Sequence, residues 1–132
     1  MFVDASALIA MLTDEDEARI FAARLQASAK RLTAPSAVLE AVVALATALD
    51  LPLDEAEGAV KRFLELMGIQ TVAMPVQALP LAVAALARYG RSDARPAGLE
   101  TADALAYAAA RYYRVPLLYK GGRFAATDIE AA

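Results

Sequence analysis

The 132-residue chain lacks two residue types on which many enzymes depend, because it contains no cysteine and no histidine. Without cysteine it can form neither disulfides nor thiolate nucleophiles, and without either residue it cannot form a zinc finger. The absence of histidine also excludes every mechanism in which imidazole serves as a base or as a metal ligand. Any chemistry that the protein performs must therefore rely on carboxylates, hydroxyls, amines or a hard cation.

Long apolar runs and an excess of positive charge are missing as well. Hydrophobic residues make up 59% of the chain, yet charges interrupt every apolar stretch before it reaches the roughly 20 residues that a membrane span needs. The N-terminus has no basic segment like that of a signal peptide, so we expect a soluble, cytoplasmic protein with no membrane partner. The net charge is −3, so binding of nucleic acid would need a local basic patch.

Short apolar strands alternate with helical patterns along the chain. Strands are expected at Phe2–Val3 and within the segments RLTAPS, IQTVA and PLLYK. Helices are expected over 7–12, 15–27, 36–49, 54–67, 76–88 and 101–113, with YGRSDARPAG as the one clear loop. The helix over 36–49 is expected to bury Leu49. This alternation predicts a single α/β domain with a mainly parallel sheet.

One charged residue stands at the junction of the first strand and the first helix. Asp4 directly follows the apolar pair Phe2 and Val3, and burying a carboxylate costs several kcal/mol unless something compensates it. Asp4 either caps the helix that follows or holds a cation. In open parallel sheets, ligands gather at the carboxyl ends of the strands, which is where Asp4 would lie.

Glu40 and Asp103 are two further acids set among apolar residues. Positions 36, 37, 43 and 44 are Ser, Ala, Val and Ala, so Glu40 has no cation at helical spacing. Taken alone, Glu40 could lie on an exposed helix side, and the helix dipole could favour Asp103. If both converge with Asp4, a divalent cation is needed to neutralise their repulsion, and oxygen ligands alone point to Mg²⁺ or Mn²⁺.

Four segments of the sequence together resemble a known family. They are VDASAL at 3–8, APSAVLEA at 34–41, ADALAYAAA at 102–110 and VPLLYKGGRFAATDI at 115–129. In this order they resemble a PIN domain, and more closely a VapC-type toxin ribonuclease of bacterial type II toxin–antitoxin pairs. The resemblance implies one PIN-like domain over residues 1–132, with three layers and a short, mainly parallel central sheet flanked by helices.

The resemblance also implies roles for individual residues. In that family, the acids that match Asp4, Glu40 and Asp103 bind Mg²⁺, for which Mn²⁺ can substitute, and the ion activates the water that cleaves RNA. The hydroxyl of Ser6 is expected to line the site and to orient a carboxylate or a water molecule. The implied products carry 5′-phosphate and 3′-hydroxyl ends.

The sequence departs from the family pattern after the last strand. Where the family often reads KGxDF, this chain reads KGGRF, so Arg123 stands in the place of the usual Asp. Asp128, in the triplet TDI, is then a candidate for the outer carboxylate; otherwise a second metal position is weak or absent. Near Asp103, Glu100 replaces the usual Asn, and it either adds a carboxylate to the rim or lies in solvent.

Several cations are candidates to attract RNA to such an acidic site. Arg88, Arg91 and Arg95 lie in or beside the loop YGRSDARPAG, and Lys120 and Arg123 follow the last strand. Side chains of this kind position phosphates without reading bases. Each of them could equally be an ordinary surface charge.

The resemblance implies three partners: an RNA substrate, a cognate VapB-type antitoxin that can insert an arginine into the acidic site, and a second copy of the chain in a homodimer. The Ala- and Leu-rich helices offer apolar faces that suit such interfaces. Two other functions remain open. One is a catalytically impaired PIN-like binding module, because of Arg123. The other is a metal-dependent phosphohydrolase with Asp4 as nucleophile, although Ser6 replaces its usual second Asp.

Overall fold

The centre of the fold is a parallel sheet of four very short strands. A computed structural model describes all residues from 1 to 132, and the strands follow the order β3-β2-β1-β4. Their bounds are Phe2–Val3 for β1, Leu32–Thr33 for β2, Gln70–Thr71 for β3 and Leu117–Leu118 for β4. All three strand pairs are parallel. The prediction of an α/β fold with a parallel sheet is therefore confirmed.

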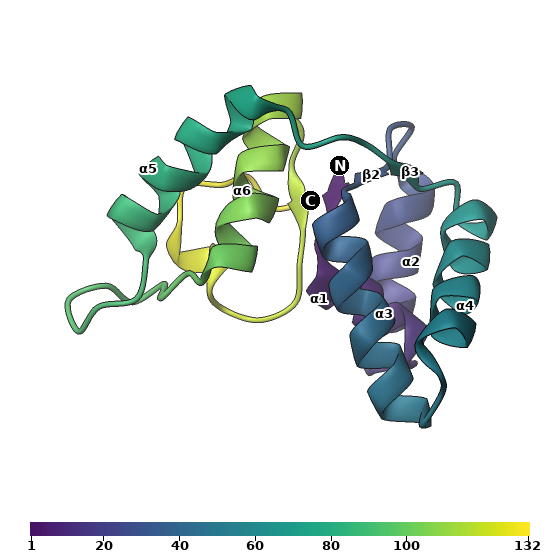
Figure 1. Cartoon of the computed structure of the whole chain (residues 1–132). Coiled ribbons are helices and arrows are strands. Elements are labelled where there is room, and N and C mark those ends of the chain that lie inside the picture. Colours follow the sequence, from purple (N-terminus) through teal and green to yellow (C-terminus); the bar gives the residue numbers. More distant parts are fainter.

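Two groups of helices cover the two faces of this sheet, as Figure 1 shows. On one side lie α1 (Ala5–Leu12), α2 (Ala18–Ala27), α3 (Pro35–Leu49) and α4 (Leu53–Leu66), and on the other lie α5 (Leu79–Tyr89) and α6 (Thr101–Tyr113). Short 3-10 turns form η1 (Val76–Ala78) and η2 (Phe124–Ala126). The chain thus has the three layers that the sequence predicted.

Adjacent strand residues supply the two hydrophobic cores, because successive side chains of a strand point to opposite faces. Val3 and Leu118 are buried against α1 to α4, whereas Phe2 and Leu117 are buried against α5 and α6. Each strand ends after two residues, so the next residue lies at the carboxyl edge of the sheet. The amide of Asp4 donates to the carbonyl of Leu118 at 3.0 Å. Asp4 therefore lies in the middle of that edge.

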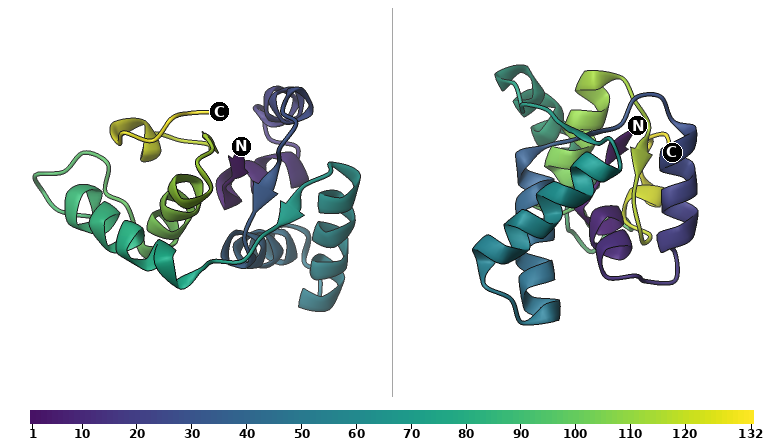
Figure 2. Two further views of the ribbon diagram at one scale, coloured as in Figure 1. Left: turned by 90° about the horizontal axis from the view of Figure 1, so that it is seen from above. Right: turned by 90° about the vertical axis from the view of Figure 1, so that its right-hand side faces the viewer.

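Both ends of the chain lie beside the sheet (Figure 2). The amide of Leu32 donates to the carbonyl of Met1 at 2.9 Å, and the amide of Ala132 donates to the carbonyl of Leu117 at 2.9 Å. The last residues therefore run next to β4. This path carries Asp128 to the side of the molecule that α5 and α6 cover.

Most predicted helices are present with shifted ends. The segment 15–27 becomes helical only at Ala18, because the residues before it form turns after α1. The segment 76–88 starts as a 3-10 turn and continues as α5. The prediction for Leu49 is wrong: it is 57% exposed, because it ends α3 just before the left-handed Asp50. No single helix is long and apolar enough to cross a membrane, and α3 and α4 reach that length only as a pair bent by 119°.

Candidate active site

Asp4 caps α1 and is buried at the carboxyl edge of the sheet. Its Oδ2 accepts hydrogen bonds from the amide of Ser6 at 3.0 Å and from the hydroxyl of Ser6 at 2.5 Å, and the residue is only 6% exposed. Burial raises the pKa of Asp4 above its usual value and the charge of Asp103 raises it further, while the bonds from Ser6 oppose this rise. Asp4 makes no ion pair. The helix cap therefore leaves the buried charge without a cation.

Asp103 lies in the first turn of α6, with its side chain 17% exposed. Its Oδ2 accepts from the amide of Glu100 at 2.8 Å and from Nη1 of Arg123 at 2.9 Å. Glu100 lies on the rim, where Nη2 of Arg91 donates to its Oε1 at 2.7 Å. Asp103 therefore lies where the helix dipole favours an acid, as one interpretation of the sequence proposed. It also faces Asp4.

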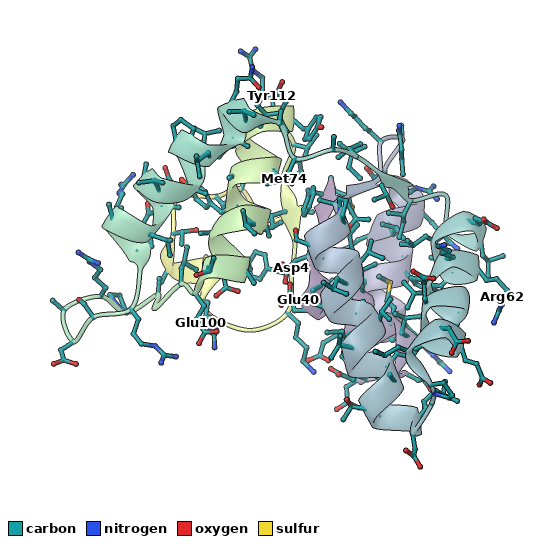
Figure 3. All side chains as sticks on the ribbon, viewed as in Figure 1. Asp4, Glu40, Arg62, Met74, Glu100 and Tyr112 are labelled. Carbon is teal, nitrogen blue, oxygen red and sulfur yellow. The ribbon has the colours of Figure 1, made fainter.

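Glu40 comes from α3 and approaches the other two acids from the opposite layer. Figure 3 shows Glu40 and Asp4 next to each other at the centre of the molecule. Partial burial raises the pKa of Glu40, and the charges of Asp4 and Asp103 raise it further. No cation pairs with Glu40. The structure thus brings together the three acids that the sequence singled out, and we call Asp4, Glu40 and Asp103 the acid cluster.

A cavity of about 230 Å³ opens at this edge of the sheet. It is lined by Asp4, Ser6 and Asp103 and by the residues from Lys120 to Phe124, whereas Glu40 lines a separate hollow on α3. The amide of Lys120 donates to the hydroxyl of Ser6 at 3.0 Å. Ser6 therefore orients the carboxylate of Asp4, as predicted for it, and also holds the loop that follows β4.

The cations near the cavity have partners that the sequence did not reveal. The ammonium of Lys120 pairs with Glu15 and, at 3.1 Å, with Glu17. Arg123, in contrast, pairs with Asp103 and lies 3.6 Å from Glu100. Contacts between residues so far apart in the chain leave no periodic signal, so only the folded structure shows them.

Arg91 and Arg95 both belong to the exposed loop between α5 and α6. Arg91 is bound to Glu100 on the rim, while Arg95 is exposed and makes no ion pair. Both remain candidates for RNA contact, with Arg95 the freer of the two.

The structure does not bring Asp128 to the acid cluster. The hydroxyl of Tyr107 donates to its Oδ1 at 2.6 Å, and its Oδ2 pairs with Arg111 and, at 3.5 Å, with Arg88. These four residues, which we call the Asp128 cluster, line a separate cavity of about 420 Å³ beside α5 and α6. The hydrogen bond from Tyr107 lowers the pKa of Asp128 below its usual value, and the two arginines add to this effect. This position does not fit the role of an outer metal ligand.

The donor chemistry of the acid cluster suits a hard divalent cation. All the side-chain ligands on offer are carboxylate oxygens, which Mg²⁺ and Mn²⁺ prefer, and the buried Asp4 lacks a positive partner. The side chains do not yet form a coordination shell, because no three potential ligands lie close enough to hold one ion. The residues fit such an ion by type and charge.

Comparisons with known proteins agree with this geometry. Residues 1–130 match the PIN domain family. Ribonuclease VapC28 of Mycobacterium tuberculosis is 38% identical over an alignment that covers 100% of this chain and 97% of the relative. A VapC ribonuclease of Rhizobium meliloti is 34% identical, with 97% and 98% covered.

A solved structure supports the fold. The crystal structure of VapC20 of Mycobacterium tuberculosis, a toxin that cleaves the sarcin–ricin loop, superposes with a TM-score of 0.73 at 19% identity and covers 99% of this chain and 97% of that one. Sequence, fold and the convergence of three acids all lead to the same assignment. The chain belongs to the PIN-domain family, among the VapC-type toxin ribonucleases.

Proposed function

We propose that this chain is a Mg²⁺-dependent endoribonuclease toxin, for which Mn²⁺ can substitute, and that a cognate antitoxin neutralises it. The observation that supports this most strongly is the acid cluster. Burial raises the pKa values of both Asp4 and Glu40, and the negative charge of Asp103 raises them further; shifts of this kind cluster at functional sites. A divalent ion removes the repulsion.

Each residue of the acid cluster has its own role in the proposed cleavage reaction. Asp4 and Asp103 would hold the ion, with Glu40 binding it directly or through water, and the bound ion supplies Lewis acidity and lowers the pKa of a water molecule. Ser6 fixes the orientation of Asp4. Glu40, with its raised pKa, is suited to accept a proton from the attacking water. In-line attack on the phosphodiester leaves a 5′-phosphate and a 3′-hydroxyl.

The substrate in this proposal is a structured RNA. The relative VapC20 cleaves the sarcin–ricin loop, and loops of this kind present phosphates that cations can position. Arg95 and Arg91 are the candidates from the exposed loop. Lys120 is the weakest candidate for RNA contact, because its ammonium is already paired with Glu15 and Glu17.

A protein partner is proposed on the basis of exposed apolar side chains. Leu39 and Val43 on α3 are 64% and 48% exposed, and Leu79 and Val83 on α5 are 61% and 58% exposed. Leu39 and Val43 form a hollow that also contains Glu40. These surfaces suit a VapB-type antitoxin and a second copy of the chain in a homodimer. A cytoplasmic location is part of the same proposal.

The test is RNA cleavage by the purified protein after removal of any partner. We expect cleavage of a structured RNA with Mg²⁺ or Mn²⁺ and none with excess EDTA. Asp103→Asn and Glu40→Gln should each lower the rate by about 10²-fold or more. Asp54→Asn makes a matched change on the exposed start of α4 and should leave the rate unchanged.

Two results would contradict the proposal. Cleavage that persists in EDTA would show that no divalent ion takes part, and wild-type rates in Asp103→Asn would remove that acid from the site. Binding of a divalent ion without any RNA cleavage would instead favour the catalytically impaired binding module.

A further inference from the structure

Arg123 is the only cation whose charged group faces the acid cluster. Its Nη1 lies 2.9 Å from Oδ2 of Asp103 and 3.6 Å from Oε2 of Glu100. Lys120 lines the same cavity, but its ammonium is paired with Glu15 and Glu17 and has no effect on the pKa of Asp4 or Glu40. The α6 side of the cavity therefore already contains a positive charge.

The rest of the acid cluster has no such partner. Neither Asp4 nor Glu40 pairs with a cation. Burial raises the pKa of each, and the charge of Asp103 raises both further. The negative charge of Glu100 on the rim is matched by Arg91 at 2.7 Å. The three charges of the acid cluster are thus neutralised in full by one divalent ion together with the guanidinium of Arg123. A second divalent ion would leave an excess of positive charge next to that guanidinium.

Arg123 also keeps part of its hydrogen-bonding capacity free. Both of its ion pairs use Nη1, while Nη2 and Nε donate to no group of the protein. The side chain is 49% exposed at the mouth of the cavity. A guanidinium in this position can offer two N–H groups side by side to phosphate oxygens, which is the geometry that arginine recognises best.

We propose that Arg123 supplies the second positive charge of this site. The acid cluster then holds one divalent ion on the Asp4 side of Asp103, and the guanidinium of Arg123 excludes a second ion from the opposite side of that carboxylate and binds the scissile phosphate with its free N–H groups. The phosphate contact rests on the ribonuclease function proposed above. The count of bound ions does not.

The count of bound ions tests the proposal without any need for activity. Mn²⁺ is titrated into the partner-free protein and measured by calorimetry and by the loss of the free-ion electron paramagnetic resonance signal. We expect one Mn²⁺ per chain in the wild type and two in Arg123→Asp, which turns the blocking charge into a ligand beside Asp103 and Glu100. Arg62→Asp makes the same charge change on the exposed face of α4, where Figure 3 shows Arg62 far from the acids, and should bind one.

The milder variant Arg123→Gln covers the case in which Arg123→Asp fails to fold. Because it frees Asp103, it should bind its single Mn²⁺ several-fold more tightly than the wild type does. Two ions in the wild type, no ion in the wild type, or an unchanged count and affinity in both folded variants would each overturn the proposal.

RNA cleavage at saturating Mn²⁺ tests the phosphate contact. Arg123→Gln should lower kcat by about 10²-fold, as for loss of one donor to a developing charge, and Arg123→Lys should recover part of it. Equal kcat in Arg123→Gln and wild type would overturn this contact. If no protein cleaves RNA, the ribonuclease proposal fails by itself, and the ion count still decides the role of Arg123 in ion binding.

Discussion

Two polar clusters of this domain each contain aspartate and reach opposite electrostatic states. In the acid cluster, Asp4 is buried without a cation, and its pKa is raised. In the Asp128 cluster, one carboxylate is surrounded by Arg88, Arg111 and the hydroxyl of Tyr107, and its pKa is lowered. The contrast separates a buried carboxylate whose charge has no positive partner from one whose charge is already paired.

The Asp128 cluster has a structural role, which is to join the C-terminal segment to α5 and α6. Arg88 belongs to α5, Tyr107 and Arg111 belong to α6, and Asp128 belongs to the C-terminal segment. The amide of Asp128 also donates to the hydroxyl of Tyr89 at 3.2 Å. The cluster therefore fastens the end of the chain to both helices of one layer. An acid singled out in a sequence therefore does not by itself identify a site, because folding can supply its partners from other segments.

The largest expected difference between the clusters is in RNA cleavage. Asp4→Asn should lower the rate by about 10²-fold or more, because it removes a charge that holds the divalent ion. Asp128→Asn should leave the rate within a small factor of the wild type, because its carboxylate lies in a different cavity. Rates are measured on one RNA at saturating Mg²⁺. A large loss in Asp128→Asn with native stability would mean that the second cluster also serves catalysis.

Stability should show the next largest difference, and in the opposite direction. Asp128→Asn should lower the free energy of unfolding near neutral pH by about 1–2 kcal/mol, because it weakens a charged hydrogen bond and two partly exposed ion pairs. The folded-state pKa of Asp128 is lowered, so its contribution is present above the usual aspartate pKa and is lost as pH falls through the folded value. Urea titrations of both proteins across acidic pH measure this. A gap that persists at the lowest pH would count against an ionic cause.

The smallest expected effect is a gain in stability when the buried charge of the acid cluster is removed. In EDTA near neutral pH, Asp4→Asn should raise the free energy of unfolding by on the order of 1 kcal/mol, since Asn caps helices as well as Asp does. The folded-state pKa of Asp4 is raised. The wild type therefore loses stability as pH rises from the usual aspartate pKa through the folded value, and the gap between the proteins closes in acid. Destabilisation by Asp4→Asn in EDTA would show that the charge is not in conflict with the fold.

The strands, the layers and the acid cluster could be predicted because each leaves a local signal in the sequence. Phe2 and Val3 are apolar and are followed at once by an acid, which places Asp4 at a strand end. Glu40 has no cation at helical spacing, and the structure gives it none from elsewhere. The resemblance of four segments to one family then gave the order of the layers.

The partners of the charged groups could not be predicted, because they depend on contacts between distant segments. Arg123 pairs with Asp103, which lies 20 residues earlier in the chain, and nothing in their spacing indicates this. Asp128 was a candidate for the outer carboxylate because of its TDI triplet, yet two helices, α5 and α6, supply its partners. Leu49 follows the apolar spacing of its helix and is still exposed, because the helix ends there beyond the reach of its neighbours.

The loop that carries Arg123 begins at Lys120, which the N-terminal part of the chain holds at two points. Its amide donates to Ser6, and its ammonium pairs with Glu15 and Glu17 in the connection between α1 and α2. That connection therefore holds the start of the loop from which, in the proposed mechanism, the guanidinium binds a phosphate. Substitutions in the connection are then expected to change the rate of RNA cleavage even though Asp4, Glu40 and Asp103 stay unchanged.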